Sequence, residues 1–313
     1  MNAVQIKDQT LPKKKNFRLK KQLEWYSFII VTIAVLIVLV YTPTLTTIEY
    51  SFFDVSTMGF NENFIGLGNY RFLLGNPTFL KAMGNTLILG VLGLLTIPLG
   101  FILASLINSV IHRGIQSFFR VGFYLPNIVT GVTIVMIFQI ILKGYDGVLN
   151  TILSSLLGTK VTTGWLSDPL YSKIGATVIW IYSNLGYSML INLASLQAIP
   201  REIYEAAAVD GASAFKQWTH LTIPNMKACF SFLLVTGMIS GLSRFTDLYI
   251  VSGYSGAGGN GGALQTILLY IYQYSFEQPR YGLSCAGAII LFVFVLFFTL
   301  INVKWSGMFK EEE

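Results

Sequence analysis

Charged residues are scarce in this sequence. Only 12% of its 313 residues are Asp, Glu, Lys or Arg, whereas 53% are hydrophobic, and the mean hydropathy is +0.62. A soluble globular chain carries about 25% charged residues, so water would not keep such a surface dispersed. The composition therefore excludes an ordinary soluble domain and indicates a protein whose solvent is lipid.

Cysteine and histidine are nearly absent as well. The two cysteines, Cys229 and Cys285, lie inside apolar runs, and the two histidines, His112 and His220, stand beside neither a cysteine nor each other. No spacing typical of metal ligands results, and we interpret the cysteines as small packing residues rather than a disulfide. The sequence thus predicts that this chain holds no metal and no cofactor.

Positive charge is concentrated at the start of the chain. Seven of the 21 Lys and Arg residues lie in the first 21 residues, and the net charge is +6. They are not interleaved along a polar face, as nucleic-acid binding would need, so we interpret residues 1–24 as a basic cytoplasmic tail beside anionic lipid. A cleaved signal peptide is the alternative. The apolar run from Trp25 to Tyr41 is longer than a signal core and no Ala-x-Ala site follows, so we expect a retained first helix.

Six apolar stretches are long enough to cross a bilayer, which needs about 20 residues per helix. Lipid offers no partners to the backbone, so each stretch must satisfy its own hydrogen bonds as a helix. The sequence therefore predicts an all-α membrane protein of six transmembrane helices, with residues 25–313 as one transmembrane domain behind the tail. The predicted spans are 25–47, 82–108, 117–142, 173–198, 227–251 and 282–304.

Basic residues and glycines characterise the segments between the spans. With the N-terminus inside, 14 of the 21 Lys and Arg residues fall in inner segments and 6 in outer ones, which satisfies the positive-inside rule. Both termini are therefore expected in the cytoplasm. The Gly-rich outer segment 252–262 lacks the Gly-Lys-Ser/Thr ending of a phosphate-binding loop and follows no strand, so we interpret it as a flexible outer loop that touches a binding protein.

The inner loop between the fourth and fifth spans, residues 199–226, carries the most specific pattern. Pro200 suits the start of a helix, and the three alanines at 206–208 are strong helix formers that leave a smooth face. Gly211 then ends the helix, and Pro224 marks a further bend before the fifth span. A loop lying flat on the membrane is the alternative, but it does not explain an Ala-rich face followed by glycine at this spacing.

This loop resembles the EAA motif of permeases in importers of the ATP-binding-cassette (ABC) superfamily. The family pattern is Glu-Ala-Ala, three residues, Gly, nine residues and Ile-x-Leu-Pro. The chain matches it except at Leu221 and Ile223, which exchange one apolar residue for another. In the family this cytoplasmic coupling loop docks into a cleft of the ATPase subunit. The resemblance implies that Glu205 pairs with a basic residue of the partner. The other docking residues implied are Ala206, Ala207, Asp210, Gly211 and Pro224.

Further segments extend the resemblance over the second to sixth spans. FIGLGNYRFLL (64–74), LASLQAIPREIYEAAAVDGAS (193–213) and SRFTDLYIVSG (243–253) are similar to carbohydrate importers of the maltose and glycerol-phosphate type. The first segment looks like the first of the two permeases in such systems. The resemblance implies half of a translocation pathway for a sugar or oligosaccharide in the cytoplasmic (inner) membrane of a prokaryote.

The resemblance also implies partners. They are a second homologous permease, two ATPase subunits that bind ATP and Mg, and an extracytoplasmic solute-binding protein, with no nucleic acid. Because this chain has no phosphate-binding loop, ATP hydrolysis is assigned to the partner and the chain is not expected to be an enzyme. An ion-driven carrier and a membrane enzyme remain as alternatives. The first lacks the internal repeat that many carriers show, and the second lacks a catalytic constellation.

Polar residues within the fourth and fifth spans are candidates for the pathway. Asn184, Tyr187 and Ser188 share one helix face, and polar groups in lipid usually face a bundle interior or a cavity. The alternative is that such residues hydrogen-bond neighbouring helices, and Arg244 is spaced to pair with Asp247. The resemblance to maltose-type importers implies these pathway positions: Ser183, Asn184, Tyr187, Gly237, Ser240, Gly241 and Arg244.

Overall fold

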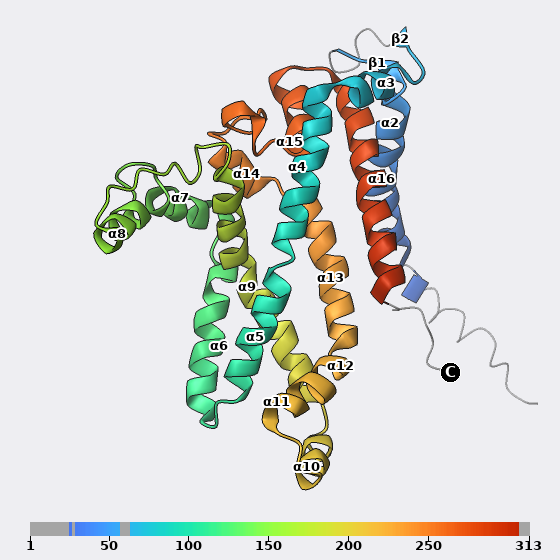
Figure 1. The fold of residues 1–313 in the computed structure, drawn as a ribbon. Helices are drawn as coiled ribbons and strands as arrows, with labels where there is room; N and C mark the ends of the chain where they lie inside the picture. The colour runs from blue at the N-terminus through green and yellow to red at the C-terminus, as the bar shows by residue number, and fades with distance from the viewer. Residues whose placement is uncertain (1–24, 27–28, 57–62, 307–313) are drawn as a thin grey trace, which may run out of the picture. The chain divides into compact units, whose positions relative to one another are not determined.

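The structure, a computed structural model, describes residues 25–26, 29–56 and 63–306, so the predicted tail at 1–24 lies outside the described residues. Over the described residues the chain is mostly helical (Figure 1), which confirms the all-α prediction. Among these described residues, five helices are long and apolar enough to cross a membrane, and a bent helix pair makes a sixth if it counts as one span. The chain divides into two parts, one ending at Glu49 and one beginning at Tyr50.

The first apolar span, Ile29–Tyr50, makes up the described first part apart from Trp25 and Tyr26, and its last residue, Tyr50, begins the second part. Within this span a π-helical turn, η1 (Ile37–Tyr41), precedes α2 (Thr42–Tyr50). Pro43 has no N–H and its ring crowds the preceding turn of a regular helix, so a widened turn at this point accommodates it. The Thr44 hydroxyl donates to the Val40 carbonyl at 2.7 Å, which keeps a polar group from facing lipid unpaired.

The second part opens with a small hairpin. Strand β1 (Phe53–Asp54) pairs antiparallel with β2 (Asn63–Phe64), and α3 (Gly68–Gly75) follows. The Asn69 side-chain amide donates to the Ser51 carbonyl at 3.0 Å and to the Phe53 carbonyl at 2.9 Å, which fastens α3 to the hairpin. This strand pair is the only departure from helix and loop among the described residues.

The second span is built from two helices, α4 (Pro77–Gly93) and α5 (Thr96–Asn108). Asn76 caps α4, because its side-chain oxygen accepts from the Thr78 N–H at 2.8 Å while Pro77 occupies the first turn. The Thr96 hydroxyl donates to the Gly93 carbonyl at 2.9 Å where the two helices meet. The span is therefore longer at its start than the predicted range 82–108.

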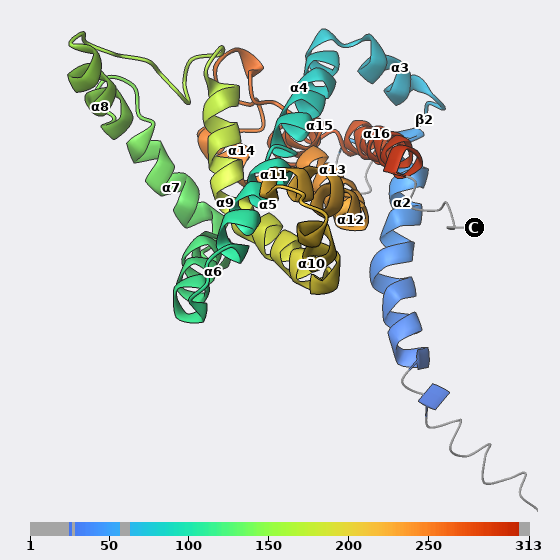
Figure 2. The ribbon, with the colours of Figure 1, turned by 60° about the horizontal axis from the view of Figure 1, so that its bottom comes forward.

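The third span differs from the prediction. Instead of one helix over 117–142, the chain forms α6 (Arg113–Ile128) and α7 (Gly131–Ile141), which meet at an angle of 96°. Pro126 removes a hydrogen bond from the end of α6, and Val129 and Thr130 adopt extended backbone before α7 begins. Both views show α7 leaving sideways from the end of α6 (Figures 1 and 2).

The remaining elements complete the bundle. The fourth, fifth and sixth spans match their predicted ranges closely, and the fifth is α13 continued by a short helix after a break at residues 243–245. The elements are α8 (Val148–Leu157), α9 (Ser172–Ala198), α10 (Arg201–Val209), α11 (Ala214–Gln217), η2 (Trp218–Thr222), α12 (Ile223–Asn225), α13 (Lys227–Leu242), α14 (Thr246–Val251), η3 (Asn260–Gly262), α15 (Ile267–Tyr272), η4 (Gln273–Glu277) and α16 (Tyr281–Ser306).

Glycines let the central helices approach closely. A Cβ atom on Gly100 of α5 would lie 2.5 Å from the Ser188 hydroxyl oxygen of α9, and one on Gly186 of α9 would collide with the Phe123 carbonyl of α6. Small residues at helix contacts are typical of membrane bundles, where packing replaces the hydrophobic effect as the source of association. The helices α5, α6 and α9 therefore form one tightly packed wall.

The Gly-rich segment 252–262 has a defined path, which differs from the flexible loop that we predicted. The Lys81 ammonium donates to the Gly261 carbonyl at 2.5 Å, and the Asn260 side-chain amide donates to the Ser167 carbonyl at 2.8 Å. Several of its glycines serve backbone geometry, since they adopt the positive φ angles that other residues rarely take. These are Gly253, Gly258, Gly259, Gly261 and Gly262.

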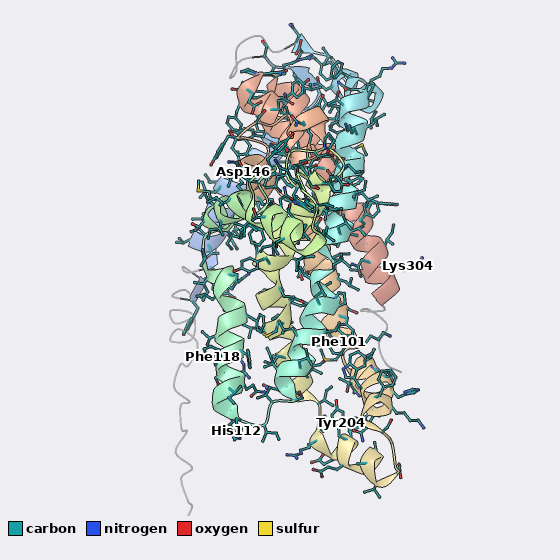
Figure 3. All side chains as sticks on the ribbon, turned by 60° about the vertical axis from the view of Figure 1, so that its left-hand side comes forward. Phe101, His112, Phe118, Asp146, Tyr204 and Lys304 are labelled. Carbon is teal, nitrogen blue, oxygen red and sulfur yellow. The ribbon has the colours of Figure 1, made fainter. Side chains whose placement is uncertain are left out.

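The predicted inner and outer segments separate to opposite ends of the second part. His112, between α5 and α6, and Tyr204, on α10, lie at the same end, whereas Asp146 lies toward the other (Figure 3). Phe118 of α6 is 73% exposed between these ends, as a side chain facing lipid or another subunit would be. This arrangement agrees with the predicted loop sides, while the cytoplasmic location of the termini stays a prediction.

Candidate functional site: a capped loop helix and a polar cavity

Helix α10 is a short helix with a sharply defined end. Asp210 follows its last residue, and Gly211 adopts a left-handed conformation with φ +78°. The Gly211 N–H donates to the Ala208 carbonyl at 3.0 Å, and the Ala212 N–H donates to the Ala207 carbonyl at 2.9 Å. This is the Schellman pattern, in which a glycine just beyond the helix lets the chain reverse and satisfy the last carbonyls. The glycine of the predicted motif is therefore the residue that ends α10.

The docking residues predicted from the sequence are brought together on a surface that the chain leaves open. Glu205, Ala206, Ala208 and Asp210 are exposed, and Ala207 is half-buried. The Glu205 carboxylate lies 3.4 Å from Nε of Arg201 one turn earlier, with the two side chains 67% and 91% exposed. Such an exposed pair contributes about 0.3–0.5 kcal/mol, so Glu205 exchanges this partner readily for another. Pro224 lies apart from them, in the first turn of α12.

Two contacts that the sequence did not predict tie the loop to the helical bundle. The Tyr204 hydroxyl is 2.9 Å from the Thr222 hydroxyl, and the Trp218 indole N–H donates to the Ser105 hydroxyl at 3.3 Å. The Trp218 ring also stacks on Phe101 of α5, with ring centroids 5.3 Å apart and planes 19° apart. The signal that could have predicted these contacts was the presence of Tyr204 and Trp218 in a loop that is expected at the membrane surface.

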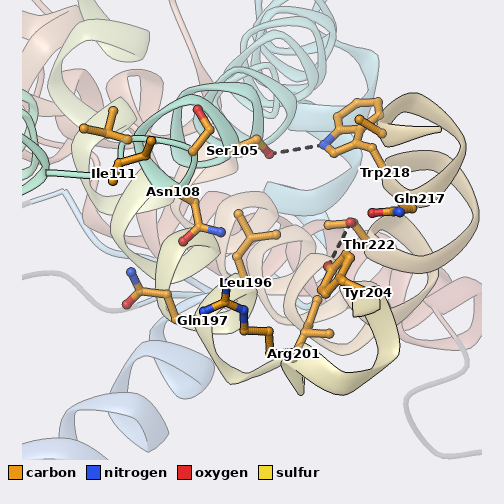
Figure 4. Close-up of a pocket in the computed structure, with 14 residues that line it drawn as sticks. Ser105, Asn108, Ile111, Leu196, Gln197, Arg201, Tyr204, Gln217, Trp218 and Thr222 are labelled. Carbon is orange, nitrogen blue, oxygen red and sulfur yellow. Dashed lines mark hydrogen bonds between the residues drawn. The ribbon is translucent and has the colours of Figure 1, made fainter. Parts of the chain in front are cut away.

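A groove lies beside these contacts, at the base of α10 (Figure 4). Its volume is about 660 Å³, and its walls come from the ends of α5 and α9 and from α10 and α11. Polar side chains that line it include Ser105, Asn108, Gln197, Tyr204 and Gln217. The loop thus stands over an open recess rather than lying flat against the bundle.

A second cavity, of about 350 Å³, lies deeper in the bundle between α5, α9 and α13. It brings together Asn184, Tyr187 and Ser188, the predicted face of the fourth span, with Gly237 and Ser240 of the fifth. The sequence did not predict the other residues that line it. These are Gly93, Thr96, Ile97, Asn127, Trp180, Leu233 and Thr236.

Three of the predicted pathway residues do not line this cavity. The Ser183 hydroxyl donates to the Ile179 carbonyl of its own helix at 2.9 Å. Gly241 packs against α4, because a Cβ atom there would lie 3.1 Å from the Gly90 carbonyl oxygen. Arg244 is 2% exposed and ion-paired with Asp247. The pairing of Arg244 with Asp247 that the spacing predicted is confirmed.

Arg244 is also held from two further sides. Its NH2 group donates to the Ala176 carbonyl of α9 at 2.9 Å, and its Nε donates to Asp247 at 3.1 Å. The guanidinium carbon lies 4.6 Å from the ring centroid of Trp180, a cation–π distance. Nε and NH2 of Arg244 are therefore engaged by protein groups beside the cavity, whereas NH1 is buried without a hydrogen-bond partner among the described residues.

The cavity offers hydrogen-bonding groups without charge. Among the lining residues that the structure describes, none is ionic, and amides and hydroxyls of Asn127, Asn184, Tyr187, Thr236 and Ser240 accompany one indole ring. The Asn184 amide N–H donates to the carbonyl of Trp180 at 3.0 Å, which fixes its rotamer. Such a lining suits a polar, uncharged molecule with an apolar face.

Comparison with known proteins shows the family to which the chain belongs. A family model described as "Binding-protein-dependent transport system inner membrane component" matches residues 96–304. The lactose transport system permease of Rhizobium radiobacter is 32% identical over 87% of this chain and 90% of its own length. The multiple sugar-binding transport system permease of Streptococcus mutans is 30% identical over 91% of this chain and 96% of its own length.

A solved structure shows the same fold. It is the crystal structure of a bacterial ABC transporter involved in the import of the acidic polysaccharide alginate, similar with a TM-score of 0.80 at 23% sequence identity, over 94% of this chain and 98% of that one. The prediction of an ABC importer permease from the loop motif is confirmed by the family match. The chain belongs to the family of binding-protein-dependent transport system inner membrane components.

Proposed function

We propose that this permease forms half of the pathway by which a sugar or oligosaccharide enters the cell, and that the loop 199–226 couples it to a separate ATPase subunit. The observation that carries this proposal is the exposed, glycine-capped α10 (Arg201–Val209). Its Tyr204 hydroxyl lies 2.9 Å from the Thr222 hydroxyl of η2, and Trp218 of η2 stacks on Phe101 of the bundle. A partner that docks on this short exposed helix could move it, and the contacts of Tyr204 with Thr222 and of Trp218 with Phe101 would pass the movement to the bundle.

Carbohydrate transport is supported by both the relatives and the cavity. The relatives named above are a lactose permease and a multiple sugar-binding permease, and the cavity has the amides, hydroxyls and aromatic ring that sugars use. Asn184 and Tyr187 on α9 and Ser240 on α13 are the residues that we assign to the pathway. Ser183, Gly241 and Arg244 support the wall around it.

The energy source lies outside this chain. The sequence has no Gly-Lys-Ser/Thr phosphate loop, so ATP and Mg are assigned to two partner ATPase subunits and the chain itself is not an enzyme. A second permease completes the pathway. An extracytoplasmic binding protein delivers the sugar, as the solved alginate transporter in complex with its periplasmic protein illustrates for that system. We place this assembly in the inner membrane of a prokaryote.

The contacts suggest how movement of the loop reaches the cavity. Trp218 of the loop stacks on Phe101 of α5, and the neighbouring Gly100 contacts Ser188 of α9, which lines the cavity. A displacement of α10 would therefore move α5 and α9 together rather than bend a flexible link. We propose that ATP-driven closure of the partner subunits acts on the cavity through this route.

Purification tests the docking assignment. We expect the tagged chain from its native membrane to bring a second permease and an ATPase subunit, identified by mass spectrometry, and Gly211→Asp to lose the ATPase subunit. Gly158→Asp is the matched control, since Gly158 caps α8 with φ +65° and, like Gly211, has open space around its Cβ position. Retention of the ATPase subunit and of transport by Gly211→Asp would refute the docking assignment.

A further inference from the structure

Trp180 is an aromatic side chain whose place in the cavity the sequence did not predict. We propose that Trp180 is the platform on which a sugar ring stacks and that the sugar is uncharged; this inference rests on the proposed transport function. Trp180 is half-buried on α9 (Ser172–Ala198), one turn before Asn184, and it lines the cavity with Thr236 and Ser240 of α13. A ring face beside amides and hydroxyls is the combination that binds the apolar face and the polar rim of a sugar.

Arg244 fixes the orientation of this ring from outside the cavity. The guanidinium lies over the indole at 4.6 Å and is itself held by Asp247 and by the Ala176 carbonyl. Arg244 is 2% exposed and is not among the residues that line the cavity. It therefore acts as a positioning residue, which presents the indole rather than its own charge to the cavity.

Gly93 of α4 fixes the ring from another side. A Cβ atom at Gly93 would lie 2.9 Å from the indole nitrogen of Trp180, closer than real Cβ contacts allow. Only glycine at this position lets the edge of the indole reach across from α9 to α4. The ring is thus held between a guanidinium and a glycine, and its orientation is built into the bundle before any sugar enters.

The charge class of the sugar follows from the lining. A carboxylate in a buried site needs a cation or several donors, because an unpaired charge loses its hydration without replacement. The described lining provides no cation, and Arg244 is engaged by Asp247. The amides and hydroxyls of the lining already donate to backbone carbonyls, as those of Asn127, Asn184, Thr236 and Ser240 do, so their oxygens remain as acceptors for sugar hydroxyls rather than as donors for a carboxylate. An acidic saccharide therefore finds no partner in the half of the pathway that this chain forms, even though the solved relative belongs to an importer of acidic alginate.

The test measures binding to the assembled complex without its binding protein, so that the binding protein's own preference does not enter. The probes are lactose, maltotriose and an alginate trisaccharide. Binding of each probe is measured by saturation-transfer NMR. We expect binding of at least one neutral probe and none of the alginate trisaccharide. Binding of the alginate trisaccharide as strong as that of the neutral probes would overturn the charge assignment, whereas a complex that binds no saccharide would overturn the proposed function itself.

Variants of α9 then test the platform. We expect Trp180→Leu to weaken binding of the neutral probe roughly tenfold and Trp180→Phe about threefold or less, since a phenyl ring keeps part of the stacking. Tyr182→Leu is the matched control, because Tyr182 packs on Phe138 and lines a different cavity. If Trp180→Leu does not assemble, Trp180→Phe and Gly93→Ala, which displaces the indole, carry the test. Losses no larger than that of Tyr182→Leu would overturn the platform.

Discussion

Two arginine–carboxylate pairs in the described residues show how differently two regions of this protein use the same chemistry. Arg201 and Glu205 pair on α10 with side chains 91% and 67% exposed, whereas Arg244 and Asp247 pair inside the bundle with side chains 0% and 16% exposed. Water solvates the first pair in either state, so its partners are exchangeable. The second pair has no such alternative, and each member depends on the other. The loop is therefore built to change partners and the cavity wall to keep them.

Breaking the buried pair is expected to have the largest effect. Arg244→Ala leaves Asp247 without its cation and removes the contact with Trp180, and we expect a loss of about 3–5 kcal/mol of stability. The unfolding midpoint of the purified complex measures it. Replacing both residues by leucine should recover much of the loss, because no unpaired charge remains. If the double variant is less stable than Arg244→Ala, the pair is not the reason for the loss.

A smaller loss of stability is expected where α6 and α9 pack closely against each other at Gly186. Gly186→Ala adds a methyl group against the Phe123 carbonyl of α6, and overpacking of this kind costs about 1–3 kcal/mol. Gly84→Ala on α4 is the control, since nothing lies within 4 Å of its Cβ position. The same unfolding measurement should separate the two variants. Equal midpoints would mean that the wall is less rigid than its contacts indicate.

The smallest effect is expected at the exposed pair. Arg201→Ala removes an interaction worth about 0.3–0.5 kcal/mol, so the unfolding midpoint should stay close to that of the unchanged protein. The contrast with Arg244→Ala sharpens the comparison, because both substitutions remove the arginine of a pair whose members lie three or four residues apart in the sequence. A large loss of stability at Arg201 would show that α10 is an integral part of the fold rather than an exposed docking element.

The sequence predicted the loop better than the cavity, for a physical reason. Helix α10 and its glycine cap are local, so the spacing from Glu205 to Gly211 was enough to predict them. The cavity is assembled from five helices, and the places of Trp180 and Asn127 in its lining depend on how α4, α6 and α9 pack together. Local spacing predicted the face of Asn184 and Tyr187 but not which neighbour covers Ser183 or Gly241. The break in the third span was missed because apolar composition continues through it.

That break has a consequence for the membrane around the protein. At 1.5 Å per residue, α6 extends about 24 Å along the bundle and α7 about 17 Å across it, whereas one straight helix through 113–141 would measure about 43 Å and exceed a hydrocarbon thickness of about 30 Å. The bend therefore places the apolar length that exceeds the hydrocarbon thickness beside the bundle rather than along it. With α6 along the bilayer normal, the 96° bend directs α7 along the membrane plane, so we expect the packing of lipids around α7, and not only bilayer thickness, to enter the free energy of insertion.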